Sequence, residues 1–144
     1  MTSSTDFTNP TDAQIKSLLS GLKRVAVVGI SAKEDRASHG IARWLVGLGL
    51  EVVGVNPVLK EPVLGLEIYP ELSDVPGKVD LVDVFRRGET VDPIIDQAIA
   101  RGDGGIWLQE QVVNAAAAQR AHDAGLFSLM DRCIYKEWLR LMNG

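Results

Sequence analysis

Residues 24–31, which read Arg-Val-Ala-Val-Val-Gly-Ile-Ser, constrain the fold more than any other segment of this chain. Four consecutive apolar residues predict a buried strand of a parallel sheet, because helices cover both faces of such strands. Gly29 then predicts a tight turn, and a helix is expected after a short polar loop. This order brings a helix N-terminus and free backbone N–H groups to the carboxyl end of the strand, where they can hold a phosphate.

Strands and helices alternate along the rest of the chain. Apolar runs predict five strands, at 25–28, 51–55, 79–85, 105–108 and 126–130, and Val63-Leu64 is a candidate for a short edge strand. Helices are predicted from Thr11, Ser38, Thr90 and Asn114, and through 134–141. This alternation is typical of right-handed βαβ units. We therefore expect one α/β domain over residues 11–144, doubly wound, with a five-stranded and mainly parallel sheet, helices on both faces, and a flexible tail at 1–10.

The composition excludes several classes of protein. The 144 residues are 46% hydrophobic with a net charge of −4, which argues against a protein that coats nucleic acid. No apolar run approaches the roughly 20 residues that a membrane span needs. The start lacks the features of a signal peptide, and the single cysteine, Cys133, fits a reducing cytoplasm. His39 and His122 have no further ligand at metal-binding spacing, so no metal site is predicted.

Basic residues follow several of the predicted strands. They are Lys33, Arg36, Lys60, Arg86 and Arg87. Because the carboxyl ends of parallel strands share one edge of the sheet, these cations are expected on one rim, which suits a ligand with several phosphates. The alternative is that they are ordinary solvent-facing loop residues.

The glycine motif matches a dinucleotide fingerprint only at its first position. That fingerprint requires glycine at 29, 31 and 34, whereas this chain has Gly29, Ser31 and Glu34. Gly29 serves the turn in either case. The Ser31 hydroxyl can contact an anion, and Ser38 can cap the following helix beside it.

The end of the second strand separates two ligand classes. Enzymes that bind nicotinamide dinucleotides usually carry Asp or Glu there, for the ribose 2′-hydroxyl. This chain has Asn56-Pro57 instead, followed by Lys60. A lysine without a carboxylate favours a phosphorylated ribose, as in NADP or in coenzyme A, which carries a 3′-phosphate.

Six blocks of the sequence, in order, resemble the stand-alone CoA-binding domain proteins. The blocks are 25–31, Asn56-Pro57, Leu64-Gly65 with Tyr69-Pro70, 82–87, 107–109 and 130–133. This family is similar to the CoA-binding domains of succinyl-CoA synthetase alpha subunits and of ADP-forming acyl-CoA synthetases. The resemblance covers nearly all of the chain from Leu22 to Leu141.

The resemblance implies a Rossmann-like domain that holds CoA, or an acyl-CoA, across the strand ends. It places the pyrophosphate near Gly29, Ile30 and Ser31 with Arg36, Ser38 and His39 nearby, and the adenosine near Val55, Asn56, Pro57 and Lys60 with Val84, Phe85 and Arg86 beside it. The family's first loop often reads Arg-Pro-Ser-Tyr, whereas this chain has Arg-Ala-Ser-His. His39 thus either replaces a stacking tyrosine or is a solvated residue of the first helical turn.

No catalytic constellation is evident. The larger synthetases use a phosphorylated histidine in a second domain and a nucleotide-grasp partner, and neither histidine here lies in a comparable glycine-rich loop. This favours a non-catalytic carrier, sensor or accessory protein with a small nucleotide-containing ligand. The alternatives are an NADP-binding oxidoreductase-like protein and a CoA-binding subunit of a separate ligase. Oligomeric state is left open.

Three further residues have two interpretations each. Asp83 is expected to be buried and to need a backbone N–H or an arginine as partner. Cys133 can form a mixed disulfide with CoA, or it can be a small buried residue. Trp107, like Phe85, is expected in the core rather than against an adenine.

Overall fold

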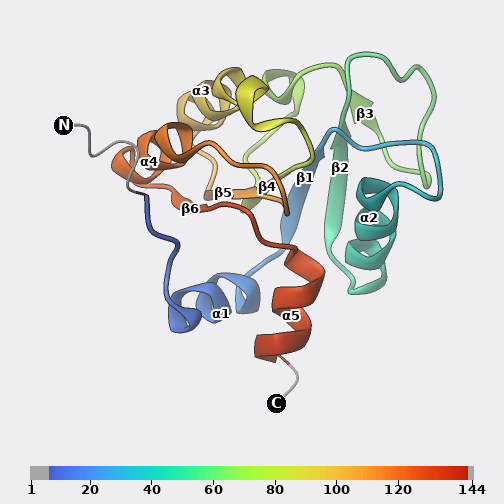
Figure 1. The fold of residues 1–144 in the computed structure, drawn as a ribbon. Helices are drawn as coiled ribbons and strands as arrows, with labels where there is room; N and C mark the ends of the chain where they lie inside the picture. Colours follow the sequence, from blue (N-terminus) through green and yellow to red (C-terminus); the bar gives the residue numbers. More distant parts are fainter. Residues whose placement is uncertain (1–6, 143–144) are drawn as a thin grey trace.

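Residues 7–142 form six strands and five α-helices in this computed structural model, which describes that part of the chain (Figure 1). The elements are α1 (Asp12–Ser20), β1 (Arg24–Val28), α2 (Ala37–Gly47), β2 (Glu51–Val55), β3 (Ile68–Tyr69), β4 (Leu81–Val84), α3 (Asp92–Arg101), β5 (Gly105–Leu108), α4 (Ala115–Asp123), β6 (Phe127–Leu129) and α5 (Ile134–Met142). Two 3₁₀ turns, Leu72–Asp74 and Gly88–Thr90, precede β4 and α3.

The six strands form one sheet in the order β3-β2-β1-β4-β5-β6, and every pairing is parallel. The order reverses between β1 and β4, because successive strands are added on one side of β1 up to β3 and on its other side from β4 onward. This is the strand order of a doubly wound Rossmann-like fold, whose ligands bind at that switch point. The predicted fold class is confirmed.

The sheet has six strands rather than the predicted five. The additional strand, β3, is two residues long and pairs with the end of β2. The candidate edge strand at Val63-Leu64 is wrong: Val63 makes only an isolated bridge to Leu66, and Leu64 has φ +56°, outside the extended region. Two partly exposed residues show no measurable period, so the pattern could not reveal β3.

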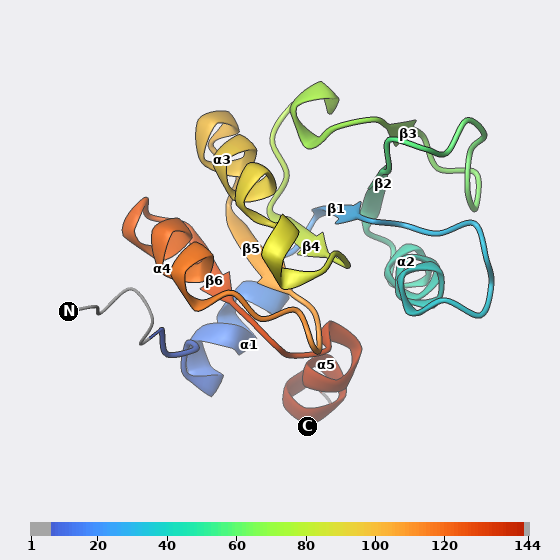
Figure 2. The same cartoon turned by 45° about the horizontal axis from the view of Figure 1, so that its top comes forward.

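Helices cover both faces of the sheet, as Figure 2 shows, with α3 and α4 on one face and α1, α2 and α5 on the other. The alternation along β1 explains this arrangement. Ala26 and Val28 pack in the cluster under α3 and α4, whereas Val25 and Val27 pack in the cluster under the other three helices. Each strand therefore buries both of its sides, which accounts for its continuous apolar sequence.

Two of the predicted helix caps are confirmed. The Thr11 hydroxyl accepts a hydrogen bond from the Gln14 N–H, and the Gln14 side chain accepts one from the Thr11 N–H, which completes a capping box. The Asn114 side chain accepts from the Ala117 N–H at the start of α4.

The predictions for Ser38 and Thr90 are wrong. Arg36 is the N-cap of α2, without a side-chain cap, and Ser38 lies buried in the first turn. Thr90 belongs to the 3₁₀ turn before α3, where its hydroxyl donates to the Arg87 carbonyl. Ser38 lies two residues after the true N-cap of α2, and Thr90 lies one residue before the N-cap of α3, Val91. A polar residue near a helix start therefore predicted the helix correctly but not its cap.

The predicted tail at 1–10 lies partly outside the described residues, which begin at Phe7. Within the described part, Asn9 is held against the end of β6. Its side chain donates to the Met130 carbonyl at 2.9 Å and accepts from the Met130 N–H at 2.8 Å. Among residues 7–142, no helix is long and apolar enough to cross a membrane.

Candidate functional site

The turn after β1 requires glycine at position 29. Gly29 has φ +89°, and a Cβ at this position would lie 2.5 Å from the carbonyl oxygen of Phe85. The close approach follows from the sheet, because the Phe85 N–H donates to the Val28 carbonyl at 2.8 Å. The end of β4 is thereby drawn tightly against the turn.

The backbone N–H of Gly29 itself belongs to the sheet, since it donates to the Val55 carbonyl at 2.8 Å. The donors without an acceptor lie on either side of the loop. Within residues 7–142, no acceptor contacts the N–H groups of Ile30, Ser31, Ala37 and Ser38. Ile30 and Ser31 follow the end of β1, and Ala37 and Ser38 begin α2, so the free donors lie at both ends of the loop. Such donors at a helix N-terminus favour an anion.

His39 fixes the shape of this loop. Its Nδ1 lies 2.9 Å from the carbonyl oxygen of Ser31. A carbonyl only accepts, so Nδ1 carries the proton and donates. His39 is 5% exposed, so its interpretation as a solvated residue of the first turn is wrong. The Ser31 hydroxyl in turn accepts from the Lys33 N–H at 3.1 Å.

Asn56 links the loops after β1 and β2. Its Nδ2 donates to the Ile30 carbonyl at 2.8 Å, and its Oδ1 accepts from the N–H groups of Val58 and Leu59. Both ends of the side chain are therefore occupied by backbone groups. Asparagine is required here for the structure, because an aspartate could not donate to the Ile30 carbonyl.

A small cavity of about 210 Å³ lies over this loop. Its lining residues are Gly29, Ser31, Arg36, Ala37, Ser38 and Phe85. Neither Arg36 nor Arg86 makes an ion pair with any residue in the range 7–142, whereas Arg87 has Glu89 at 3.7 Å. Two guanidinium groups thus remain available beside the free N–H donors, and this combination suits a phosphate.

A second cavity, of about 220 Å³, opens on the other side of the β1–β4 switch point. It lies between the ends of β1 and β2 and the start of α3, with Pro57, Pro70 and Gln97 among its walls and Arg86 at its edge. The proline rings offer flat apolar surface, which suits a nucleoside. The Gln97 side chain is held within the protein, since it accepts from the Ser73 N–H and donates to Glu71.

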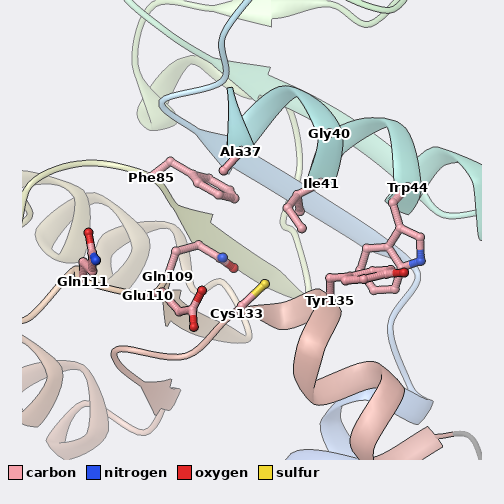
Figure 3. A pocket seen from close by; sticks show the side chains of 10 residues that line it. All are labelled: Ala37, Gly40, Ile41, Trp44, Phe85, Gln109, Glu110, Gln111, Cys133 and Tyr135. Carbon is pink, nitrogen blue, oxygen red and sulfur yellow. The ribbon is translucent and has the colours of Figure 1, made fainter. Parts of the chain in front are cut away.

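A larger cavity, about 540 Å³, runs along one face of α2 (Figure 3). Its residues on this helix lie at positions i, i+3, i+4 and i+7, so the face extends for roughly 10 Å from the N-terminal end of α2; they are Ala37, Gly40, Ile41 and Trp44. The opposite wall comes from the segments after β4, β5 and β6 and from the start of α5. It contains Phe85, Gln109, Glu110, Gln111, Cys133 and Tyr135.

Aromatic contacts close the far end of this cavity. Trp44 of α2 meets Tyr135 of α5 edge to face, with ring centroids 5.1 Å apart, and meets Trp138 in the same way at 5.7 Å. These contacts join two helices that are far apart in the sequence, and Figure 3 shows Trp44 beside Tyr135.

Phe85 connects the cavities. It lines the large cavity, the one over the loop, and a shallower one of about 320 Å³ that also contains Arg86. Arg86 reaches from there into the nucleoside-sized cavity. The four cavities therefore adjoin one another along the carboxyl edge of the sheet, through Phe85 and Arg86. Together we call them the strand-end groove, and its lining residues are those of these four cavities.

Asp83 is fully buried in β4 and neither of its carboxylate oxygens has a hydrogen-bond partner. The expectation of a backbone or arginine partner is wrong. Asp83 pairs in register with Val27 and Trp107, so it lies among apolar side chains on the face under α2 and α5. Burial raises the pKa of this carboxyl well above its usual range.

The structure brings most of the predicted site residues to the strand-end groove. Gly29, Ser31, Arg36, Ser38, Val55, Pro57, Phe85 and Arg86 line it. Ile30, His39 and Val84 are buried behind it, and Asn56 supports it. Lys60 is exposed and lines none of the four cavities that form this groove. Trp107 is fully buried, as expected, and its Nε1 donates to the Arg132 carbonyl.

The sequence reasoning missed the apolar half of the groove. The helical spacing of Ala37, Gly40, Ile41 and Trp44 could have revealed it, because small residues on the same face as a tryptophan leave space. No group of three or more His, Cys, Asp or Glu side chains within residues 7–142 is arranged to hold a metal.

Comparison with known proteins gives a family match. Residues 23–138 match the sequence model of a family described as a CoA binding domain. The uncharacterized protein YneT of Bacillus subtilis (strain 168) is 36% identical over 126 residues, which are 88% of this chain and 93% of that protein.

Two solved structures extend the comparison. A hypothetical protein from Pyrococcus horikoshii OT3 superposes with a TM-score of 0.87 at 34% identity, over 95% of this chain and 99% of that one. A dinucleotide-forming acetyl-coenzyme A synthetase from Candidatus Korarchaeum cryptofilum superposes with a TM-score of 0.62 at 27% identity. That match covers 72% of this chain but 25% of the synthetase, so the likeness concerns one part of a larger protein.

Proposed function

The chain belongs to the CoA binding domain family, and from this premise we propose that it binds coenzyme A, free or acylated, along the strand-end groove. Two features support the proposal: the cavities of the groove adjoin one another, and its polar and apolar parts follow in the order that CoA requires. A nucleoside-sized cavity comes first, then a loop with free N–H donors, then a long apolar channel. CoA has adenosine, pyrophosphate and a pantetheine arm in that order.

The observation that carries the proposal is the set of free donors around the first loop. The N–H groups of Ile30, Ser31, Ala37 and Ser38 have no acceptor within residues 7–142, and Arg36 has no ion-pair partner there. The first N–H groups of any helix have no acceptor within the helix, and those at the start of α2 lie beside the two that follow β1. A pyrophosphate over this loop would accept from several of them at once.

The adenosine end would lie between Pro57 and Pro70, with Arg86 near the ribose phosphate. Arg86 borders both this cavity and the next along the groove, so one guanidinium can reach the phosphates on either side of the ribose. Lys60, on the exposed loop after β2, would have to move inward to take part, and its predicted role stays a prediction.

The pantetheine arm would follow the face of α2 toward Trp44. Its two amide groups need hydrogen-bonding partners in a mostly apolar channel. Gln109 offers a donor and the carboxylate of Glu110 offers an acceptor along the same wall. An acyl group would extend the arm toward the pair formed by Trp44 and Tyr135.

We further propose that the protein holds this ligand without transforming it, in the cytoplasm, as a carrier, a sensor or an accessory to a ligase. Within residues 7–142 the groove contains no nucleophile–base pair: His39 donates to a backbone carbonyl, and Cys133 makes no hydrogen bond to a histidine. The likeness to one part of an acetyl-CoA synthetase supports the accessory role.

A panel of ligands in isothermal calorimetry and thermal denaturation tests the proposal. CoA, acetyl-CoA, 3′-dephospho-CoA, NADP and NAD are compared. CoA at 100 times its Kd should stabilise the protein by about 2.7 kcal/mol. NADP binding without CoA binding would replace the proposal by the oxidoreductase-like alternative, and no binding in the panel would refute both.

A further inference from the structure

Cys133 packs against the edge of the core and also lines the strand-end groove. It is half-buried, at the junction between β6 and α5, and it lines the large cavity together with Ile41 and Phe85. It also begins α5, since its carbonyl accepts from the Glu137 N–H at 3.0 Å. The sulfur is thus held by a helix that Trp44 and Trp138 fix against α2.

Gln109 marks the same place as a ligand site by an independent observation. It is 5% exposed, and its Oε1 accepts from the Ile134 N–H at 3.2 Å. That bond fixes the orientation of the amide, because only the oxygen can accept from an N–H. The Nε2 group is left without an acceptor within residues 7–142, and Figure 3 shows the side chain extending into the cavity beside Cys133.

The Nε2 group is thus a free donor at the wall of the cavity, and a ligand group that accepts from it gains a hydrogen bond there. An apolar acyl chain offers no acceptor, so this position suits a ligand group that contains one. The carbonyl of an amide is suitable. In a pantetheine arm, an amide lies only a few bonds from the terminal sulfur, so the ligand sulfur comes near Cys133 when this amide meets Gln109.

We propose that Cys133 is a site of reversible covalent attachment of CoA through a mixed disulfide. This inference rests on the proposed function, because docking of the adenosine diphosphate part brings the arm to the thiol. In the reaction the Cys133 thiolate attacks one sulfur of a CoA disulfide. A new bond forms between Cys133 and that sulfur, the original S–S bond breaks, and the other CoA leaves as a thiolate that takes up a proton.

No external oxidant is needed, because one disulfide is exchanged for another. The CoA disulfide supplies the oxidised sulfur, and one free CoA is released for each CoA attached. A second thiol, such as dithiothreitol, reverses the step by the same chemistry. The groove thereby acts as a site that retains CoA under oxidising conditions and releases it when thiols are abundant.

Intact-protein mass spectrometry tests this inference. The purified protein is incubated with CoA disulfide or, separately, with glutathione disulfide at equal concentration. We expect one CoA per chain, removed by dithiothreitol and absent in Cys133→Ser. Docking raises the local concentration of the ligand sulfur, so the reaction with CoA disulfide should be at least about tenfold faster than with glutathione disulfide.

A competitor distinguishes disulfide exchange that depends on docking of the nucleotide part from exchange at any accessible thiol. Adenosine 3′-phosphate 5′-diphosphate, which has no sulfur, should slow attachment of CoA and leave the reaction with glutathione disulfide unchanged. Equal rates for the two disulfides, no effect of the competitor, or no adduct would each overturn the inference.

Calorimetry of the natural protein with reduced CoA and excess dithiothreitol reports the proposed function separately. Binding in this experiment, together with no adduct from CoA disulfide, refutes the covalent site and leaves the proposed function intact. If the protein does not bind reduced CoA, the proposed function fails, and the covalent site that rests on it fails too.

Discussion

The side-chain amide of Asn56 donates a 2.8 Å hydrogen bond to the backbone carbonyl of Ile30, and this bond holds the loop after β2 against the loop after β1. The two loops border different cavities of the strand-end groove. The proposed adenosine and pyrophosphate positions are therefore set relative to each other by one residue, which is not itself required to touch the ligand.

Replacement of Asn56 by aspartate should disrupt this link. A carboxylate cannot donate to the Ile30 carbonyl, and it repels that oxygen. We expect Asn56→Asp to lose about 1–3 kcal/mol of unfolding free energy and to bind CoA more weakly. Chemical denaturation and calorimetry measure the two effects. An Asn56→Asp protein that gains NAD binding with unchanged stability would contradict the positioning role.

Gly29 and Gly49 provide a matched pair of glycine positions. Their φ angles are +89° and +87°, but a Cβ at position 29 would lie 2.5 Å from the Phe85 carbonyl oxygen, whereas at position 49 nothing lies within 4 Å. Both alanine variants carry the cost of a positive φ, about 1 kcal/mol. Only Gly29→Ala must also displace β4.

We expect Gly29→Ala to lose at least about 1 kcal/mol more than Gly49→Ala in urea denaturation, and to lose CoA binding as well. Gly49→Ala should bind CoA normally. Equal losses of stability would mean that Phe85 and its strand move aside easily, and the turn would then not be held rigidly by the sheet.

Asp83 should make the stability of the protein fall as the pH rises. Burial raises the pKa of this carboxyl in the folded state. Above the usual pKa of aspartate the unfolded chain has released the proton while the folded chain still holds it. The folded state then binds more protons, so the unfolding free energy falls with a slope of up to about 1.4 kcal/mol per pH unit.

Asp83→Asn removes the titrating carboxyl, and with it this dependence of the unfolding free energy on pH. We expect the stability of the variant relative to the natural protein to increase steadily from about pH 4 upward, as measured by urea denaturation at several pH values. Asp35→Asn, at an exposed position, serves as the control and should follow the natural protein. Parallel curves for natural protein and Asp83→Asn would show that the buried carboxyl has found a partner.

The sequence predicted the architecture well because strands and helices here are locally encoded. Residues 24–31 carry a four-residue apolar run and a glycine, and both requirements are visible without a partner strand. The bond from Asn56 to Ile30 could not be predicted in the same way, because it joins residues 26 positions apart and depends on strand order. Asp83 is a similar case, since its lack of a partner is decided by which face of β4 meets α2 and α5.

The apolar channel shows a different limit. Ile41 is both a core residue and a wall of the large cavity, and helical periodicity alone does not distinguish these roles. The distinction depends on what faces the helix. Here the ends of β5 and β6 stand away from α2, and the space between them is left open.

The positive charges beside the loop between β1 and α2 should affect the affinity for CoA and leave the stability of the fold unchanged. Arg36 and Arg86 line the strand-end groove and make no ion pair within residues 7–142. Charge-assisted hydrogen bonds contribute roughly 1.5–3 kcal/mol. We therefore expect Arg36→Glu and Arg86→Glu each to weaken CoA binding by about 10- to 100-fold. Calorimetry provides the measurement. Their melting temperatures without ligand should remain close to that of the natural protein.

Arg43→Glu is the matched control for charge. Arg43 is exposed on α2, has no ion-pair partner in the described chain, and lines none of the four cavities of the strand-end groove. The change in net charge is identical, so any loss of affinity in Arg43→Glu measures only long-range electrostatics. Comparable losses in all three variants would refute a local role for Arg36 and Arg86. Lys60→Glu, measured beside them, tests the predicted contact of Lys60 with the ribose phosphate.

Gly40 allows the apolar channel to be closed without disturbing the core. A Cβ at this position meets nothing within 4 Å, although Gly40 lies in the middle of α2 and lines the large cavity. Gly40→Ala should therefore stabilise the protein by about 0.5–1 kcal/mol, through helix propensity, and bind CoA with little change.

Gly40→Leu places a branched side chain in the channel. We expect it to weaken CoA by at least about tenfold, since the buried arm loses its space, and to leave adenosine 3′-phosphate 5′-diphosphate unaffected. Calorimetry with both ligands decides the matter: equal weakening of the two would mean that the arm lies elsewhere, because a ligand without an arm has no reason to respond to a side chain in the channel.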